Sequence, residues 1–287
     1  MKTYQLEFIT PLFSRGSYDD RPEIRPASIR GQLHWWFRAL GGNYSSEKAI
    51  FGGIHDGATA SKVVIRTSHL PSLEQKVNVN TLPHKIGPRA SPKWAFPIGA
   101  GFRLHVSERL GGLTPALDAT FNRALHAWLY LGTLGLRSTR AAGSFVWSSS
   151  SSGEPSYPSS FEDYDATCCG LVDGSPIRFA MLNKVYANAE AARRDVSDTL
   201  GGHDDNRGQD DLSRLNDPLG KITRGRKTSP LRFRIIRIGN HYRIATIWDG
   251  RQSVTGNRPS DLLGIIKLLA DRKPNLGEQL QASRLAG

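Results

Sequence analysis

The sequence predicts an α+β protein that begins with a ferredoxin-like, RRM-like βαββαβ domain. The first 150 residues hold four stretches with strand patterns and two with amphipathic helix patterns. Their order along the chain is strand, helix, strand, strand, helix, strand. A serine-rich segment follows, and the pattern beyond it is less regular. We therefore expect a first domain over residues 1–150 and a second, degenerate ferredoxin-like domain over residues 151–287.

Each element of the first domain has a local signal. Strands are expected at residues 4–9, 62–68, 96–106 and 145–147, where apolar and β-branched residues alternate or cluster. One helix is expected from Ile29 to Leu40, with Ser28 as its N-cap and two glycines after it. Thr114 and Pro115 begin a second helix that ends near Leu131. Proline-containing loops are expected at residues 14–26 and 71–95.

The second domain has fewer signals. Residues 148–160 begin with five serines and are expected to form a flexible linker or surface loop. Residues 197–217 are expected to be mobile. A hairpin is expected around Gly239 and Asn240, between strands at 231–238 and 241–248. Residues 259–270 form an amphipathic helix pattern, and a C-terminal helix is expected after Pro274.

Charge and cysteine content limit the classes of function. The formal net charge is +12, and the positive residues cluster, which favours a polyanionic partner over charge kept for solubility alone. No apolar run approaches the length of a membrane span, and no basic amphipathic helix exposes an apolar face, so we expect no membrane partner. The only cysteines, Cys168 and Cys169, are adjacent, which excludes a disulfide framework and zinc-ligand spacing. We expect a cytosolic protein without a signal peptide, metal or cofactor.

The stretch RPASIRGQLHWWFRAL, residues 25–40, has two different faces when it is drawn as a helix. Its apolar residues fall on one side, which predicts a buried face made of Ile29, Leu33, Trp36, Phe37 and Leu40. Arg30, His34 and Arg38 form a basic stripe beside that face, because they are spaced four residues apart. Trp35 points away from the buried face, and Gly31 lies beside the stripe.

This second face has the chemistry needed to hold RNA. Arginine side chains can bond phosphate oxygens in a fork, and a helix N-terminus attracts anions. Gly31 permits close approach of a sugar–phosphate chain, and Trp35 can stack a base. Each residue also has an alternative role. We expect Trp35 to pack on a second domain or a neighbouring subunit rather than to stack a base. We expect His34 to make a polar contact rather than to act in catalysis, and the arginine stripe could be a solvated face.

At this helix the sequence resembles the RAMP proteins of type III CRISPR effectors, and most closely the first subunit of the type III-B Cmr complex. The resemblance extends through EKAIFGG and SKVVIR. The stretch LGTLGLRSTRAAGSF resembles the glycine-rich loop of that superfamily, although Ala141 and Ala142 stand where a glycine is common. The stretch DPLGKITRGRKTSPLRFRI resembles a later basic segment. The resemblance covers residues 1–70, 115–150 and 217–248.

The resemblance implies ferredoxin-like folds, binding of crRNA and assembly with other Cmr subunits. In that family this subunit lies near the 3′ end of the crRNA and is not the nuclease. The resemblance thus points to a third basic region, the loop that holds Lys221 to Lys227, besides the helix and the glycine-rich loop. These three regions could converge in the fold. The residues predicted to bind crRNA or target single-stranded RNA are Arg21, Arg25, Ser28, Arg30, Gly31, His34, Trp35, Arg38, Lys62, Arg137, Arg140, Gly143, Ser144, Lys221, Arg224, Arg226 and Lys227.

The alternative to a non-catalytic binding subunit is an endoribonuclease. Metal-free cleavage needs a general base and a general acid; His34 is the best candidate, and Tyr18 or Lys62 is a candidate partner. Metal-dependent cleavage needs carboxylates, which Asp19 and Asp20 supply, although the arginines around them favour salt bridges. A second acidic tract lies in a segment whose composition predicts disorder and contains Asp204, Asp205, Asp210 and Asp211. We favour the binding subunit.

Overall fold

The first half of the chain forms a four-stranded antiparallel sheet, called the first sheet below. The computed structural model describes residues 1–18, 20–54, 57–201, 219, 228–256, 259–272 and 274–285. The strand order is β2-β5-β1-β6, which is the order of the ferredoxin-like fold, so the predicted fold is confirmed. The elements that make this half are β1 (Lys2–Phe8), α1 (Pro26–Ala39), α2 (Tyr44–Phe51), β2 (Val63–Ser68), β5 (Gly101–Glu108), α3 (Pro115–Leu131) and β6 (Phe145–Ser149).

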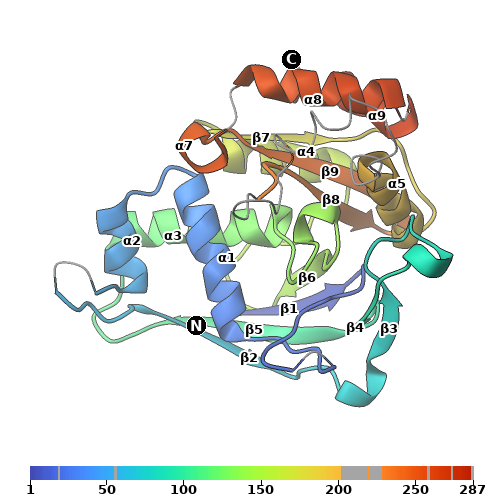
Figure 1. Ribbon diagram of the computed structural model, residues 1–287. Helices are drawn as coiled ribbons and strands as arrows, with labels where there is room; N and C mark the ends of the chain where they lie inside the picture. Colours follow the sequence, from blue (N-terminus) through green and yellow to red (C-terminus); the bar gives the residue numbers. More distant parts are fainter. Residues whose placement is uncertain are drawn as a thin grey trace.

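One face of the first sheet is apolar because its strands alternate. Tyr4, Leu6 and Phe8 of β1 are fully buried, and Gln5 between them is exposed. Since successive side chains of a strand point to opposite faces, the apolar set lies on one side. Helices α1 and α3 cover that side (Figure 1). The predicted buried face of α1 is confirmed, with Leu40 half-buried at its end.

The start of α1 differs from the prediction. The helix begins at Pro26, and Arg25 is the N-cap, in an extended conformation. Proline fits this first position because its φ is already helical and it lacks the N–H that would be left unbonded there. Ser28 is therefore inside the first turn, where its N–H donates to the Arg25 carbonyl, and its predicted role as N-cap is wrong. The Thr114 cap of α3 is confirmed: its hydroxyl accepts from the Leu117 N–H.

Residues 71–95 are more regular than the predicted loop. They contain a hairpin of β3 (Val77–Asn80) and β4 (Pro92–Ala95), with short 3-10 helices η1 (Leu73–Gln75) and η2 (Gly87–Arg89). The prolines lie at strand ends or in the connection, where they break no ladder hydrogen bond. Val77 and Val79 alternate along β3 and pack beside Phe13.

The second half forms a three-stranded antiparallel sheet, the second sheet, in the order β7-β9-β8. Its elements are α4 (Phe161–Val172), β7 (Ile177–Met181), α5 (Ala189–Gly201), β8 (Leu231–Ile238), β9 (His241–Asp249), α7 (Gln252–Thr255), α8 (Pro259–Arg272) and α9 (Pro274–Gln281). This half has the element order of a ferredoxin-like fold, with β7, α5, β8, β9 and α8 in succession. Its strand order also matches that fold, except that the last strand is lacking among the described residues. The degenerate second half, the predicted hairpin and both C-terminal helices are thus confirmed.

The second sheet is buried on both faces. Phe179, Ile236 and Ile247 join the core beneath α3 and α4. Phe233 and Ile244 point the other way and pack with α5, α8 and α9. The layers are therefore the first sheet, then α1 and α3, then the second sheet, then α8 and α9 (Figure 1). No helix in the described ranges is long and apolar enough to cross a membrane.

Helix α5 overlaps the start of the segment that was predicted to be mobile. The helix continues through Gly201, and Ser197 and Leu200 on it are buried. The mobility prediction is wrong for these first residues, because their apolar face packs on the second sheet. The acidic tract from Asp204 to Asp211 lies outside the described residues.

A fully buried arginine joins the two sheets. Arg234 of β8 has no exposed surface, and its guanidinium donates to the carbonyl oxygens of Trp128 (3.4 Å), Gly132 (2.5 Å) and Phe145 (2.5 Å). The first two carbonyls are at the C-terminal end of α3, which carries partial negative charge. The same guanidinium lies over the Phe145 ring at 4.5 Å from its centroid. Arg234 thus binds α3 and β6 of the first half to β8 of the second.

We expect Arg234→Met to lower the free energy of unfolding by about 2–4 kcal/mol, because it leaves buried carbonyl groups without donors. Urea denaturation measures this. The control is Arg237→Met on the same strand, which breaks a partly exposed ion pair with Glu7 (2.8 Å) and is expected to cost under about 1 kcal/mol. Equal losses in the two variants would contradict the role of Arg234.

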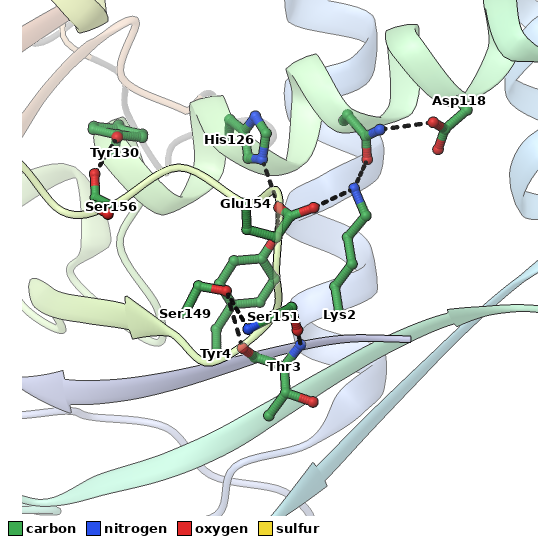
Figure 2. A network of polar contacts seen from close by, with 11 residues as sticks. Lys2, Thr3, Tyr4, Asp118, His126, Tyr130, Ser149, Ser151, Glu154 and Ser156 are labelled. Atoms are coloured by element: carbon green, nitrogen blue, oxygen red, sulfur yellow. Dashed lines mark hydrogen bonds and ion pairs between the residues drawn. The ribbon is translucent and has the colours of Figure 1, made fainter.

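The serine-rich segment is anchored rather than free, which corrects the predicted flexible linker (Figure 2). The Glu154 carboxylate accepts hydrogen bonds from Lys2 Nζ (2.7 Å), His126 Nε2 (3.1 Å) and the Tyr4 hydroxyl. Tyr130 also donates to the carbonyl of Ser156. The composition of the segment could not reveal this, because its partners are about 150 residues earlier, on β1, or on α3.

The same contacts change the acidity of Glu154. Burial alone would raise the pKa of this carboxyl, but the hydrogen bonds from Lys2, Tyr4 and His126 outweigh it and lower the pKa to about 2. A lowered folded-state pKa adds stability above the unfolded value, near 4.5, and that stability is lost as the pH falls toward 2.

We expect Glu154→Gln to cost about 1–3 kcal/mol of unfolding free energy at pH 7, because it removes the charge that three donors face. The wild type should lose stability between pH 4.5 and pH 2 more steeply than the variant. Chemical denaturation at several pH values measures both effects. Glu74→Gln, at an exposed carboxyl, is the control, and parallel pH profiles for E154Q and wild type would argue against the anchor.

Candidate nucleic-acid interface

The loop between β1 and α1 lies beside the glycine-rich loop, defined here as residues 132–143. The Leu136 N–H donates to the Phe13 carbonyl (2.6 Å), and the Gly143 N–H donates to Pro11 (3.0 Å). Arg15 lies two residues after Phe13, and Arg137 lies directly after Leu136, so each loop has an arginine beside the contact. The structure therefore brings two of the predicted basic segments together, next to the start of α1.

Two glycines of this loop stand where the backbone passes close to other backbone atoms. Gly135 has φ +86°, and a Cβ there would lie 2.5 Å from the Phe13 carbonyl oxygen. Gly143 has φ +64°, and a Cβ would collide with the Leu134 carbonyl. Only glycine combines left-handed backbone angles with such close approach at low cost. Gly135 thus lets the loop lie against Phe13, and Gly143 lets the end of the loop return to Leu134.

Gly143 and Ser144, two of the predicted RNA contacts, are buried at the end of this loop and have bonds within the protein. Ser144 is fully buried, and its hydroxyl donates to Ala141 (2.9 Å) and accepts from the Ile235 N–H (3.0 Å). Gly143 is buried, and its N–H is already bonded to Pro11. Both residues position the loop and have no free surface for a ligand. Ala141 and Ala142, which depart from the usual pattern, are also buried.

The cations of these two loops differ in exposure and in their contacts. Arg137 is exposed, with φ +57°, and Arg140, at the end of η3 (Ser138–Arg140), is half-buried. In the first loop Arg21 is exposed and lies over the Tyr18 ring at 5.3 Å, and Arg25 is exposed and 3.7 Å from Glu23. Ser28, half-buried in the first turn of α1, follows directly after them.

The basic stripe on α1 faces α2 instead of solvent alone. Arg38 Nε donates to both carboxylate oxygens of Glu47 (2.8 and 2.7 Å), and His34 Nδ1 is 2.5 Å from the same carboxylate. Glu47 is 5% exposed. Burial would raise its pKa, but the hydrogen bonds from Arg38 and His34 lower it. The polar role weighed for His34 is thus observed, and the spacing of the stripe fits a clamp between two helices.

Arg30 makes a similar contact one turn earlier. Its guanidinium donates to the Phe51 carbonyl at the end of α2 and to the Ser61 hydroxyl (3.2 Å). Burial lowers the pKa of Arg30, with a smaller effect from Arg109 in the same direction. Lys62 follows Ser61 directly and is half-buried. Gly31 on α1 is exposed, and a Cβ there would meet no atom within 4 Å.

Trp35 packs on the second half, which is the role weighed against base stacking. The Arg232 guanidinium lies 3.8 Å from the Trp35 ring centroid, and Arg251 lies 5.0 Å from it. Arg251 is itself paired with the buried Asp249 (2.7 Å). Burial lowers the pKa of Arg232 to about 10, and Arg251 adds to that effect while Asp249 opposes it. A cation over the indole ring fastens α1 to the second sheet.

The remaining predicted residues are partly outside the described ranges. Lys221, Arg224, Arg226, Lys227 and Asp19 all lie there, so their predicted roles stay predictions. Asp20 is exposed, and its carbonyl accepts from Lys76 Nζ (3.0 Å). Among the described residues, no group of three histidine, cysteine or acidic side chains is placed to hold a metal ion.

Comparison with known proteins agrees with this geometry. The model of the RAMP superfamily matches residues 5–146, which include β1, α1, the glycine-rich loop and the start of β6. The match spans just under half of the chain, so this segment is similar to the RAMP superfamily. Two curated relatives from Pyrococcus furiosus also match: Cmr subunit Cmr1-2, 40% identical over 72 residues, and Cmr1-1, 32% identical over 146 residues. These matches cover 22% and 43% of the chain, but only 37% and 40% of the relatives' own lengths.

Solved structures show the same fold over more of the chain. The crystal structure of Cmr1 from Pyrococcus furiosus, in its apo form, covers 86% of this chain and 87% of its own, with a TM-score of 0.59 and 18% identity. One chain of a type III-B Cmr-beta complex bound to cognate target RNA and AMPPnP covers 98% and 99%, with a TM-score of 0.60 and 11% identity. The fold of both halves is thus shared with these two solved structures.

Within residues 5–146, Glu47 is a residue of the candidate site that the sequence did not predict. The stretch EKAIFGG contains it, but its pairing with α1 depends on how α2 folds back. We expect Glu47→Gln to lower the unfolding free energy by about 1–3 kcal/mol, because it weakens the contacts of Arg38 and His34 together. Thermal or urea denaturation measures this. Glu23→Gln, which touches the exposed Arg25 pair, should cost under about 0.5 kcal/mol, and a loss as small at Glu47 would contradict the clamp.

Proposed function

We propose that this chain is a non-catalytic RNA-binding subunit of a type III-B CRISPR effector complex. In this proposal it assembles with other Cmr or RAMP subunits, holds single-stranded RNA near the 3′ end of the crRNA, and aids engagement of target RNA. The superfamily match over residues 5–146 and the Cmr1 relatives support the assignment. The chain's own geometry supplies a place for the RNA.

The observation on which the proposal depends is the contact between two basic loops, the β1–α1 loop and the glycine-rich loop. The backbone bond from Leu136 to Phe13 fixes the glycine-rich loop against the loop that leads into α1. The loop before α1 folds back on itself, because Arg15 pairs with Pro22 and Arg25 Nη2 lies 3.5 Å from the Arg15 carbonyl. Exposed Arg21, Arg25 and Arg137 are therefore proposed to form one region. Arginine forks bind phosphate oxygens in bidentate fashion, and such contacts hold an RNA backbone without reading its bases. Arg140, Lys62 and the basic segment from Lys221 to Lys227 extend this proposed interface.

The roles within the interface differ. We assign direct RNA contact to Arg21, Arg25, Arg137 and Arg140, which lie on loops. The stripe of Arg30, His34 and Arg38 is assigned a supporting role, because its polar atoms already bind Glu47, Phe51 and Ser61. Ser28 and Gly31, at the exposed start of α1, are places where a phosphate can approach the helix N-terminus.

We expect single-stranded RNA binding to weaken steeply between 50 and 200 mM salt, because phosphate contacts release counterions. Arg21→Ala, Arg25→Ala and Arg137→Ala should each lower the slope of log K against log salt by about 0.7. Fluorescence anisotropy with a labelled oligonucleotide measures this. Lys267→Ala, at an exposed position on α8 across the molecule, is the matched control and should leave the slope unchanged (Figure 1). A flat salt response of the wild type would overturn the proposal.

The endoribonuclease alternative has one observation in its favour. The buried Glu47 carboxylate orients the His34 ring, an arrangement also found where a histidine acts as a general base. Labelled RNA incubated with the protein, in Mn²⁺ or in EDTA, distinguishes the two. The binding proposal expects intact RNA in both conditions. Cleavage that His34→Ala or Asp19→Ala/Asp20→Ala abolishes would instead establish the nuclease.

A further inference from the structure

The face of the first sheet opposite α1 and α3 carries an ordered polar surface, called the open face here. Strand pairing places its residues in two rows across the sheet. Arg66 of β2, His105 of β5 and Thr3 of β1 are paired in one row. Ser68, Arg103, Gln5 and Ser148 are paired in the next. Since paired residues point to the same side of a sheet, these seven side chains share one face.

Hydrogen bonds connect the open face across three strands. His105 contacts the Thr3 hydroxyl through Nδ1 (3.1 Å) and the Ser68 hydroxyl through Nε2 (2.7 Å). The Ser68 hydroxyl also contacts His69 Nδ1 (3.1 Å). Arg103 contacts His69 Nε2 (3.5 Å) through Nη1 and the Gln5 amide oxygen (3.2 Å) through Nε. The surface is thus a connected network and not a scatter of polar side chains.

The guanidinium determines the direction of its own bond to His69 and is compatible with one ordered chain of bonds beyond it. Arg103 is only a donor, so His69 Nε2 must accept from it, and neutral His69 must then carry its proton on Nδ1. That N–H donates to the Ser68 oxygen, so the Ser68 hydroxyl is free to donate to His105 Nε2. His105 then carries its own proton on Nδ1 and donates to Thr3. One cation therefore sets the tautomer of neutral His69, and in this arrangement a continuous chain of hydrogen bonds runs from Arg103 to Thr3.

The backbone at the end of this network is held in an uncommon conformation. His69 has φ +51°, in the left-handed region, which costs energy for a residue with a Cβ. This conformation lets the chain turn after β2 while the ring keeps its contacts with Ser68 and Arg103. His69 is one of three non-glycine residues with positive φ in the described ranges, and the other two lie in the glycine-rich loop.

The charges of the open face favour an anion. The two rows contain two exposed arginines and no carboxylate. Arg66 makes no side-chain hydrogen bond or ion pair with the described residues. The nearest acid in the next row, Glu7, is already paired with Arg237 of β8 (2.8 Å). Positive charge here is therefore left without a partner from within the described protein.

The side chains also indicate which part of a nucleic acid would bind. Sheets that bind bases do so by stacking them on aromatic side chains of the central strands. The two rows contain no aromatic residue other than the imidazole of His105, which is half-buried between two hydroxyls. Arginine, serine, threonine and glutamine side chains match phosphate oxygens and ribose hydroxyls instead.

We propose that the open face is a second binding surface, which takes the ribose–phosphate backbone of a single-stranded RNA. Arg66 and Arg103 contact phosphates, and Ser68, Gln5 and Ser148 contact ribose hydroxyls or phosphate oxygens. His69 and His105 act as positioning residues that hold Ser68 and Arg103 in place. This inference rests on the proposed RNA-binding function, and it adds a surface that is separate from the loops beside α1.

The test compares the two surfaces in the full-length protein. The open-face variant is Arg66→Gln/Arg103→Gln, and the loop variant is Arg25→Gln/Arg137→Gln, which removes the same charge. The probe is a fluorescein-labelled 20-nucleotide oligouridylate, titrated by anisotropy at several salt concentrations. We expect the open-face variant to lower the salt slope by about 1.4, which corresponds to two lost phosphate contacts.

The possible outcomes are distinguishable. If the open-face variant binds like the wild type and the loop variant binds more weakly, the inference is overturned and the proposed function stands. If neither variant differs from the wild type, both fail. If the double variant does not fold by circular dichroism, Arg66→Gln alone carries the test, because its side chain makes no described polar contact, and a slope lowered by about 0.7 supports the inference. Ultraviolet crosslinks to the peptide that contains His69 and Ser68 would support it independently.

Discussion

The fold depends on how the charge of Arg234 is satisfied between the two sheets. A guanidinium removed from water needs hydrogen-bond acceptors for its donors, and here these are carbonyls at the end of α3 and on β6. This requirement fixes β8 against the first half. It also fixes the glycine-rich loop, because Gly132 and Phe145 stand on either side of it and the adjacent Ser144 bonds Ile235 of β8. The position of the proposed RNA interface thus follows from a contact in the core.

Several other arginines have the same structural use. Arg193 on α5 is 2% exposed, donates to the Thr81 carbonyl (2.7 Å) and lies over the Phe13 ring. Its burial lowers its pKa to about 10. The Arg232 guanidinium packs over the Trp35 ring in a similar way. The net charge of +12 therefore overstates the charge that is available to a polyanion, because some of it holds segments of the chain together.

The sequence predicts what is encoded locally. The buried face of α1, the Thr114 cap and the Gly239 turn depend on residues within a few positions of one another, and the structure contains all three. The domain boundary near residue 150 stays a prediction, and one hydrophobic core includes residues from both sides of it, such as Phe145 and Tyr164. Partners distant in sequence were not predictable. No residue near Glu154 in the sequence indicates that it pairs with Lys2. The sequence pattern of a basic stripe is the same whether its arginines bind phosphate or a carboxylate such as Glu47.

The proposed surfaces share a chemical property that restricts what the protein can recognise. The arginines of the loops and of the open face are suited to phosphates, and the tryptophan that appeared suited to stacking a base, Trp35, is covered by Arg232. Phosphate contacts set the path of a strand but carry no sequence information. A subunit built in this way would hold any RNA of the right length and charge. Selection of a target then has to come from base pairing with a guide strand, for which a surface that grips only the backbone leaves the base edges free.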